Sequence, residues 1–273
     1  MPAPLDHPAH FVPNTTESLV RDLRALGLAA GHAVIVHTSL SALGWTVGGG
    51  EAVIRALMEV LTPAGTLVMP AQTADNSEPA HWVNPPVPEA WWPVIRAHQP
   101  PYDPQTTPTG YLGVVPELFR SFPNVMRSHH PMISFSAWGA GAQSIVSHQS
   151  LEAPIGDESP IARLAAMDGR VLLLGVDHSV NTSLHLAEHR ARIAQPIEKQ
   201  GAAMWVNGKR RWVEYDLFAY DSSDFAALGS DYEAAVGYTP NPIGLGSARQ
   251  HRLGPLLAFA TGWLEAKRGR TEA

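Results

Sequence analysis

The stretch VLLLGVDHSVNTSLHLAEH, residues 171–189, decides the fold of this chain. Its apolar beginning, residues 171–176, predicts a buried strand that ends at Asp177, and a helical pattern begins near Asn181 or Thr182. In open α/β sheets, ligands bind outside the carboxyl ends of the strands. We therefore expect an α/β fold with a functional site directly after this strand.

Two residues of the following helix predict acid–base chemistry. Residues three apart on a helix are neighbours, so Glu188 can accept one imidazole N–H of His185. The other ring nitrogen then stays free to take a proton near neutral pH. His178 falls on the loop between strand and helix. We predict that His185 and Glu188 form a catalytic pair, although histidines are more often structural or surface residues.

Outside this stretch the chain alternates strands and helices. A strand at 33–36, a helix at 51–61 and a second strand at 66–69 predict a βαβ unit. Asn207–Gly208 is a strong turn signal and predicts a hairpin. The other segments predict one mixed sheet flanked by helices: helices at about 16–26, 111–121, 159 onward, 182–192, 224–235 and 250–267, and strands at 132–138, 197–206 and 211–215.

Two segments lack this pattern. Residues 1–12 predict a loose N-terminal arm, and residues 71–109 are rich in Pro and Trp with little periodicity. A long loop in a compact domain is either functional or disordered, and the aromatic content argues against disorder. We expect residues 71–109 to form either a packed loop that makes one wall of a cleft or a rigid structural flap. We expect the whole chain, residues 1–273, to form a single domain.

Composition excludes several classes of function. The 273 residues are 45% hydrophobic and 16% charged, carry a net charge of −6 and include no cysteine. Disulfides and thiol nucleophiles are excluded, and an acidic balance disfavours nucleic acid as a partner. It suits a small cationic substrate, although solubility is the more general reason for an acidic balance. We expect no membrane span and no signal peptide, and therefore a cytoplasmic protein.

A second candidate site follows the first strand. Residues 37–50, HTSLSALGWTVGGG, place hydroxyls and then glycines before a helix. Glycines let a backbone approach a ligand closely, and free N–H groups at a helix start bind phosphate. The pattern matches neither the P-loop nor the dinucleotide motif. It predicts either a site for a pyrophosphate-bearing ligand or a plain tight turn.

Hydrolase chemistry is the weaker hypothesis. His185-x-x-Glu188–His189 matches the H-x-x-E-H pattern of some zinc peptidases, for which Glu198 or Glu214 would supply a third ligand. The arginines after His189 suggest a face that turns to solvent. No G-x-S-x-G motif occurs, which disfavours a serine hydrolase.

Acidic side chains are candidates for binding a cationic substrate. Asp103 and Asp221 each follow a tyrosine, Tyr102 in the first case, which favours them over Asp75. His130 is held extended by the proline after it and would either line the cleft or form a structural hydrogen bond.

Five long motifs carry a family resemblance. In chain order they are HTSLSALGWTVGG (37–49), WVNPPVPEAWW (82–92), YDPQTTPT (102–109), RSHHP (127–131) and NTSLHLAE (181–188). Together they resemble the antibiotic N-acetyltransferase family, whose best-known members are the aminoglycoside 3-N-acetyltransferases. The likeness runs from about residue 15 to residue 265, and motifs in the same order are far more specific than any one of them.

The resemblance implies transfer of an acetyl group from acetyl-CoA to the 3-amino group of an aminoglycoside. It also implies an α/β fold with a mixed sheet, distinct from the GCN5-type acetyltransferase fold. His185 would be the general base, oriented by Glu188, in a direct transfer without metal. Backbone N–H groups near Ser39 or Ser41, or the His37 ring, would stabilise the oxyanion.

The expected site has a catalytic part, a donor part and an acceptor part. The sequence departs from the family pattern at 109–113, which leaves the shape of one cleft wall open. The alternatives are acetylation of a different amine, a zinc hydrolase or a non-catalytic nucleotide-binding module, and a homodimer stays open. The expected residues are His185, Glu188 and His37 for catalysis; His37, Thr38, Ser39, Leu40, Ser41, Val47, Gly48 and Gly49 for the donor; and His178, Asp75, Tyr102, Asp103, His130 and Asp221 for the acceptor.

Overall fold

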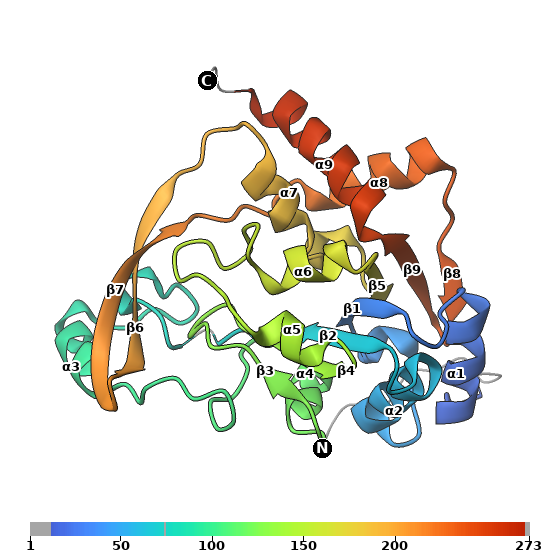
Figure 1. Cartoon of the computed structure of the whole chain (residues 1–273), viewed down its shortest axis with the longest axis horizontal. Coiled ribbons are helices and arrows are strands. Elements are labelled where there is room, and N and C mark those ends of the chain that lie inside the picture. Colours follow the sequence, from blue (N-terminus) through green and yellow to red (C-terminus); the bar gives the residue numbers. More distant parts are fainter. Residues whose placement is uncertain (1–11, 74, 271–273) are drawn as a thin grey trace.

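A mixed sheet of seven strands forms the centre of the part of the protein that the structure describes (Figure 1). This computed structural model describes residues 12–73 and 75–270, so the expected arm at 1–12 lies, except for Val12, outside the described residues. The expected α/β fold with a mixed central sheet is confirmed. In spatial order the strands are β3 (Met126–Arg127), β4 (Phe135–Gly139), β2 (Thr66–Pro70), β1 (Ala33–Thr38), β5 (Arg170–Leu174), β9 (Gly246–Arg252) and β8 (Asn241–Ile243).

The predicted βαβ unit is present. β1 runs parallel to β2, with α2 (Gly49–Leu61) between them in the chain, and β1 also runs parallel to β5. The carboxyl ends of these three strands therefore meet at one edge of the sheet. His37 and Thr38, at the end of β1, lie opposite Leu173 and Leu174 of β5.

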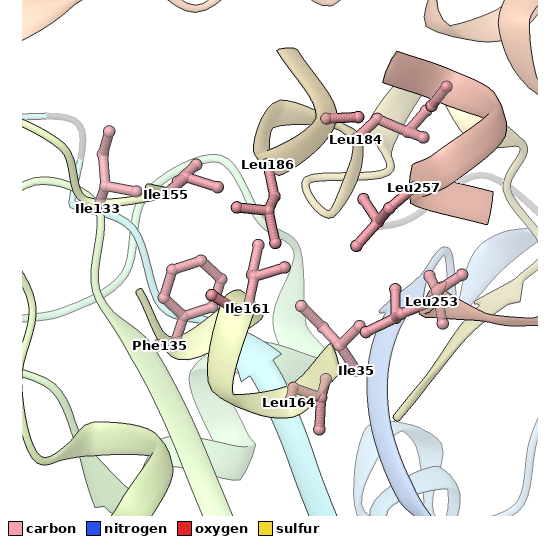
Figure 2. Packing of buried hydrophobic residues seen from close by; sticks show 14 of the residues in the cluster. Ile35, Ile133, Phe135, Ile155, Ile161, Leu164, Leu184, Leu186, Leu253 and Leu257 are labelled. Atoms are coloured by element: carbon pink, nitrogen blue, oxygen red, sulfur yellow. The ribbon is translucent and has the colours of Figure 1, made fainter. Parts of the chain in front are cut away.

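Helices cover both faces of the sheet, because alternate strand residues point to opposite sides. Val34 and Val36 pack in one apolar cluster with α1 (Thr16–Ala25), α2 and α4 (Val114–Arg120). Ile35 packs in the other cluster, shown in Figure 2. That second cluster includes residues of α5 (Ala142–Val146), α6 (Pro160–Ala166), α7 (Leu184–Arg190), α8 (Phe225–Val236) and α9 (Leu253–Arg268).

A long hairpin projects from the sheet region. β6 (Ile197–Val206) and β7 (Lys209–Phe218) pair around Asn207–Gly208, both of which have positive φ, as the predicted turn requires. Segment 71–109 packs on this hairpin: the Asn76 side chain bonds both the N–H and the C=O of Ala203, at 3.0 and 3.2 Å. The segment includes α3 (Trp92–His98), an element that the sequence did not indicate, which lies beside the hairpin in Figure 1.

Several predicted boundaries were wrong. Residues 250–252 belong to β9 rather than to the last helix, which runs from Leu253 to Arg268. β9 forms because residues 248–252 pair with β5 across the sheet, and local periodicity cannot reveal such a distant partner. The short elements α5 and β8 were not predicted either. None of the helices in the described ranges is long and apolar enough to cross a membrane.

Candidate active site

Two adjoining cavities open at the carboxyl edge of β1, β2 and β5. The larger, of about 900 Å³, is lined by the end of β1, parts of the loop 39–49, residues 111–116 and parts of the loop 176–182. The smaller, of about 430 Å³, lies between residues 110–112 and the base of the β6–β7 hairpin. His185 therefore sits where the cavities meet, because four residues line both: Gln72, Tyr111, Leu112 and His185.

α7 presents the His185 ring to this junction. Its Nδ1 lies 2.7 Å from Oε2 of Glu188, which is the i,i+3 contact that the sequence predicted. The ring packs against Tyr220 and Phe225, at centroid distances of 4.9 and 4.7 Å. No residue within the described ranges is hydrogen-bonded to Nε2, and the side chain is 15% exposed. This nitrogen is free to take a proton from a bound molecule.

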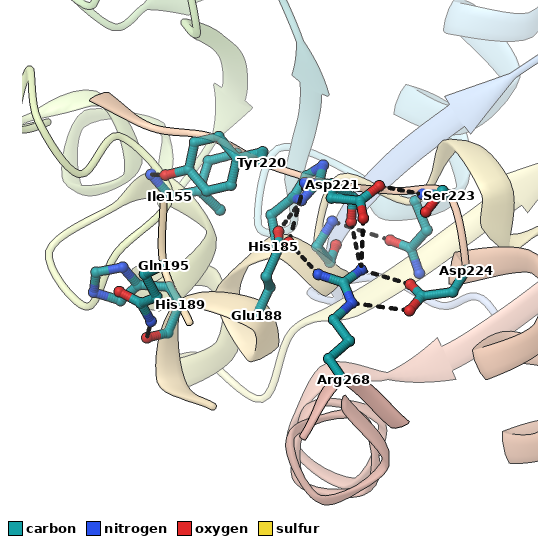
Figure 3. Close-up of polar contacts among 12 residues, drawn as sticks. Ile155, His185, Glu188, His189, Gln195, Tyr220, Asp221, Ser223, Asp224 and Arg268 are labelled. Atoms are coloured by element: carbon teal, nitrogen blue, oxygen red, sulfur yellow. Dashed lines mark hydrogen bonds and ion pairs between the residues drawn. The ribbon is translucent and has the colours of Figure 1, made fainter. Parts of the chain in front are cut away.

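An arginine from the last helix holds Glu188. The carboxylate is 1% exposed, and its Oε1 accepts hydrogen bonds from the Asp221 backbone N–H at 3.0 Å and from Nη1 of Arg268 at 2.5 Å. Arg268 also binds both oxygens of Asp224, at 2.9 and 2.6 Å (Figure 3). The bonds to Asp224 and Glu188 raise the pKa of the guanidinium. A carboxylate buried this deeply needs such partners to stay charged.

His37 lines the larger cavity beside this pair. It is 7% exposed, and its Nε2 is buried without a hydrogen-bond partner among the described residues, as is Oγ1 of Thr38. Burial, together with the nearby His178 and His185, lowers the pKa of His37 to about 3. The ring is therefore neutral at pH 7. Unpartnered buried polar atoms are costly, which favours a ligand that bonds them.

The loop after β1 supplies further polar groups to the larger cavity. The hydroxyls of Ser39 and Ser41 lie 3.2 Å apart, and both residues line the cavity with Leu40 and Gly49. The Ser39 backbone N–H already donates to Leu174 at 2.9 Å, so it is not free for an oxyanion. Val47 and Gly48, expected at the donor site, do not line the cavity. Lining residues that the sequence did not indicate include Val36, Val114, Val115, Pro116, Val180 and Phe225.

Two histidines expected at the acceptor have structural partners instead. His178 is 2% exposed and lies between Asn181 and Glu233, at 3.2 and 3.3 Å. Nδ1 of His130 accepts the backbone N–H groups of Met132 and Ile133, and the ring is 1% exposed. Neither lines either cavity. Both rings support residues that line the cavities, Asn181 in the first case and Met132 and Ile133 in the second, without lining the cavities themselves.

The expected acceptor carboxylates also lie elsewhere. Asp75 is exposed, Asp103 accepts the N–H groups of Gln105 and Thr106 in a turn, and the Asp221 carboxylate accepts the N–H of Ser223. The Tyr102 hydroxyl donates to the backbone of the segment 127–131. None of them lines either of these two cavities. Aspartates close to tyrosines thus stabilise turns here, and Glu198 is the carboxylate that lines the smaller cavity.

The H-x-x-E-H pattern does not gather metal ligands. Both Glu188 oxygens are bonded by His185, Asp221 and Arg268, and Figure 3 shows His189 beside Gln195, apart from that contact. Within the described ranges, the group of metal-ligating side chains whose ligand atoms lie within 4.8 Å of one another is His178, Glu233 and His251. His189 is not part of it.

The His178 group is held by hydrogen bonds. Asn181 accepts the N–H of Ser183 through Oδ1 at 3.1 Å, so its Nδ2 donates to Nδ1 of His178. The proton of the neutral ring is then on Nε2, which faces Glu233. This network fixes the loop 176–182, parts of which line the larger cavity.

The buried histidines predict acid sensitivity of the fold. Burial lowers the pKa of His37 to about 3 and that of His130 and His178 to about 4. In the unfolded chain a histidine pKa is about 6.5, so the unfolded state binds more protons below that pH. We expect the urea midpoint to fall steadily from pH 6.5 to pH 4.5. His148→Gln, at an exposed site, should leave this slope unchanged; a flat midpoint would contradict the burial of these rings.

Comparison with known proteins gives consistent matches. The family described as aminoglycoside 3-N-acetyltransferase matches residues 35–265. The SPbeta prophage-derived aminoglycoside N(3')-acetyltransferase-like protein YokD of Bacillus subtilis is 43% identical over 252 residues, 92% of each chain. Its crystal structure superposes with a TM-score of 0.92, covering 96% of this chain and 97% of that one, at 41% identity.

Two ligand-bound structures are also similar. A binary complex of AAC-IIIb with CoASH has a TM-score of 0.85 at 30% identity, covering 96% of this chain and 100% of that one. AAC-VIa bound to sisomicin has a TM-score of 0.84 at 28% identity, covering 94% and 100%.

Proposed function

Because the chain belongs to the aminoglycoside 3-N-acetyltransferase family, we propose that it transfers the acetyl group of acetyl-CoA to the 3-amino group of an aminoglycoside. One observation carries the mechanism: the His185 ring, held by Glu188, lies where the two cavities meet. We assign the larger cavity to acetyl-CoA and the smaller to the amine. The ring then lies between donor and acceptor.

In this mechanism His185 is the general base. An aminoglycoside amine is mostly protonated at pH 7, and it loses that proton to solvent before the neutral nitrogen attacks the thioester. Nε2 of His185 takes the proton of the attacking nitrogen while Nδ1–H stays bonded to Glu188. A C–N bond forms, the C–S bond breaks, and His185 returns the proton to the departing thiolate. The products are the amide and free CoA.

His37 is the donor that we propose for the oxyanion. Its neutral ring carries one N–H, the residue lines the donor cavity, and its Nε2 is buried and unpartnered within the described ranges. An N–H aimed at developing charge in a site that excludes water is worth about 10²- to 10³-fold in rate. The Ser39 backbone N–H, bonded to Leu174, does not take this role.

The donor cavity fits a pantetheine arm and its pyrophosphate. Three residues with hydroxyl groups, Thr38, Ser39 and Ser41, line this space, and so does Gly49 at the start of α2. The Gly49 N–H donates to Thr46, so we assign polar contacts with the ligand to the hydroxyl groups. Acetyl-CoA would supply the activated acyl group there.

Replacing Gly49 tests the donor assignment. Gly49 has φ +58, and a Cβ there would have no atom within 4 Å, so a side chain would extend into the open lining of the cavity. We expect Gly49→Leu to weaken CoA binding by at least about tenfold, because positive φ disfavours a branched residue and its bulk occupies ligand space. Calorimetric titration with CoA measures this. Gly27→Leu, also at positive φ but at the end of α1, is the control; equal effects would remove this loop from the donor site.

The proposed activity is tested by incubating the protein with acetyl-CoA and gentamicin. We expect thiol release matched by a product one acetyl group heavier, with the substituent on the 3-amino nitrogen. Thiol release with unrelated amines but not with gentamicin would favour the different-amine alternative. CoA binding without turnover on any amine would favour a non-catalytic binding module.

A further inference from the structure

The inner face of the β6–β7 hairpin forms one wall of the smaller cavity. Side chains two apart on a strand share a face, so Glu198 lies on the same face as Gln200 and Ala202. Gln200 is 7% exposed, and Tyr215 and Leu217, which lie opposite Gln200 and Glu198 on β7, are 6% and 4% exposed, so this face is the inward one at this end of the hairpin. Glu198 is the outermost of the three, and it lines the cavity together with Gln200 and His185.

Glu198 is an anion without a partner within the described ranges. On the outer face of the hairpin, Lys199 pairs with Asp216 at 2.5 Å. The Gln200 amide is bonded to His81 and to the Glu78 backbone N–H, at 3.0 and 3.3 Å. Glu198 is exposed, and it is the carboxylate that the hairpin presents to the smaller cavity, where a ligand can reach it.

The rest of this cavity is largely apolar. Ile133, Ile155, Leu217 and Phe218 are buried there, and Tyr220 continues the wall to the His185 ring. The hydroxyl of Thr73 donates to Pro131. A ligand that fills this space therefore places carbon against the wall and needs a cation for Glu198, in addition to the amine that reaches His185.

We propose that Glu198 is the acceptor-recognition residue and binds a second ammonium of the substrate. The acceptor class is then a ring diamine: one amino group reaches Nε2 of His185, the other pairs with Glu198, and a C–H face lies on the apolar wall. This inference rests on the proposed function and narrows it. Further amino groups of a larger aminoglycoside would extend beyond this cavity.

A variant pair on the hairpin tests the proposal. Glu198→Gln keeps the shape but removes the charge, while Asp216→Asn removes a charge from the outer face. A charge-assisted hydrogen bond that is lost should raise KM about tenfold. We expect that rise in Glu198→Gln for gentamicin and diaminocyclohexane, with kcat changed less than twofold, and no rise for cyclohexylamine. Asp216→Asn should match the parent protein with all three amines.

Two outcomes would overturn the proposal. One is an unchanged KM for both diamines in Glu198→Gln, and the other is an equal rise for the monoamine. If the parent protein acetylates none of these amines, the proposed function fails, but the inference is still decided by calorimetric binding of diaminocyclohexane to both variants. A Kd that rises about tenfold in Glu198→Gln alone supports it, and equal Kd values refute it.

Discussion

Replacing His185 with alanine should lower turnover by about 10²- to 10⁴-fold while CoA binding persists. The ring is the group with a free nitrogen at the junction of the two cavities, and its Nδ1 is bonded to Glu188. Without it, the attacking nitrogen has no positioned acceptor for the proton that it gives up as the C–N bond forms. Single-turnover kinetics with saturating acetyl-CoA measure the loss, and calorimetric titration with CoA tests binding.

Two variants of the same helix serve as controls. Glu188→Gln should lower turnover less than His185→Ala, because an amide oxygen can still accept the Nδ1–H while the charge is lost. His189→Ala should have little effect, since this residue lines neither cavity. A larger loss in Glu188→Gln would assign the proton transfer to the carboxylate, and a large loss in His189→Ala would favour the zinc hypothesis.

The second large effect is expected for Arg268→Ala. Arg268 is 17% exposed and bonds Glu188, which is 1% exposed, as well as Asp224. Removing one partner of a buried ion pair leaves an uncompensated charge and costs about 3–5 kcal/mol. We expect the free energy of unfolding to fall by about that amount, and turnover to fall with it because Glu188 no longer orients His185.

Urea unfolding at pH 7.5 measures this loss. Arg252→Ala is the matched control: Arg252 and Asp168 also form an arginine–carboxylate pair, but their side chains are 56% and 59% exposed. Exposed pairs contribute about 0–1 kcal/mol. Equal losses in the two variants would show that Glu188 does not depend on Arg268.

Local patterns were sufficient to predict the contact between His185 and Glu188 and the elements around it. The apolar run at 171–176 and the spacing of His185 and Glu188 predicted a strand, a helix and an i,i+3 contact, all of which are present, although β5 ends at Leu174. The order of strand, helix and strand over residues 33–69 predicted the βαβ unit, and its glycine-rich loop lines the larger cavity. These features depend on residues close together in sequence, so periodicity and spacing reveal them.

The residues that line the proposed acceptor cavity could not be predicted from the sequence, because contacts between distant segments of the chain position them. Asp103 and Asp221 looked suitable because each follows a tyrosine, yet both carboxylates bond nearby backbone N–H groups. Glu198 had no local signal, because what makes it a ligand group is the face of the hairpin on which it lies. Arg268 is eighty positions from Glu188, and only the packing of α9 on α7 brings them together.

That separation has a consequence during synthesis. The ribosome must add eighty residues after Glu188 before the guanidinium that neutralises it is available. A nascent or prematurely terminated chain that stops short of the final turn of α9 would contain every strand, yet its carboxylate would be buried without a countercharge. We therefore expect such truncated chains to be inactive and prone to degradation, so that quality control would act on an enzyme missing only its last turn.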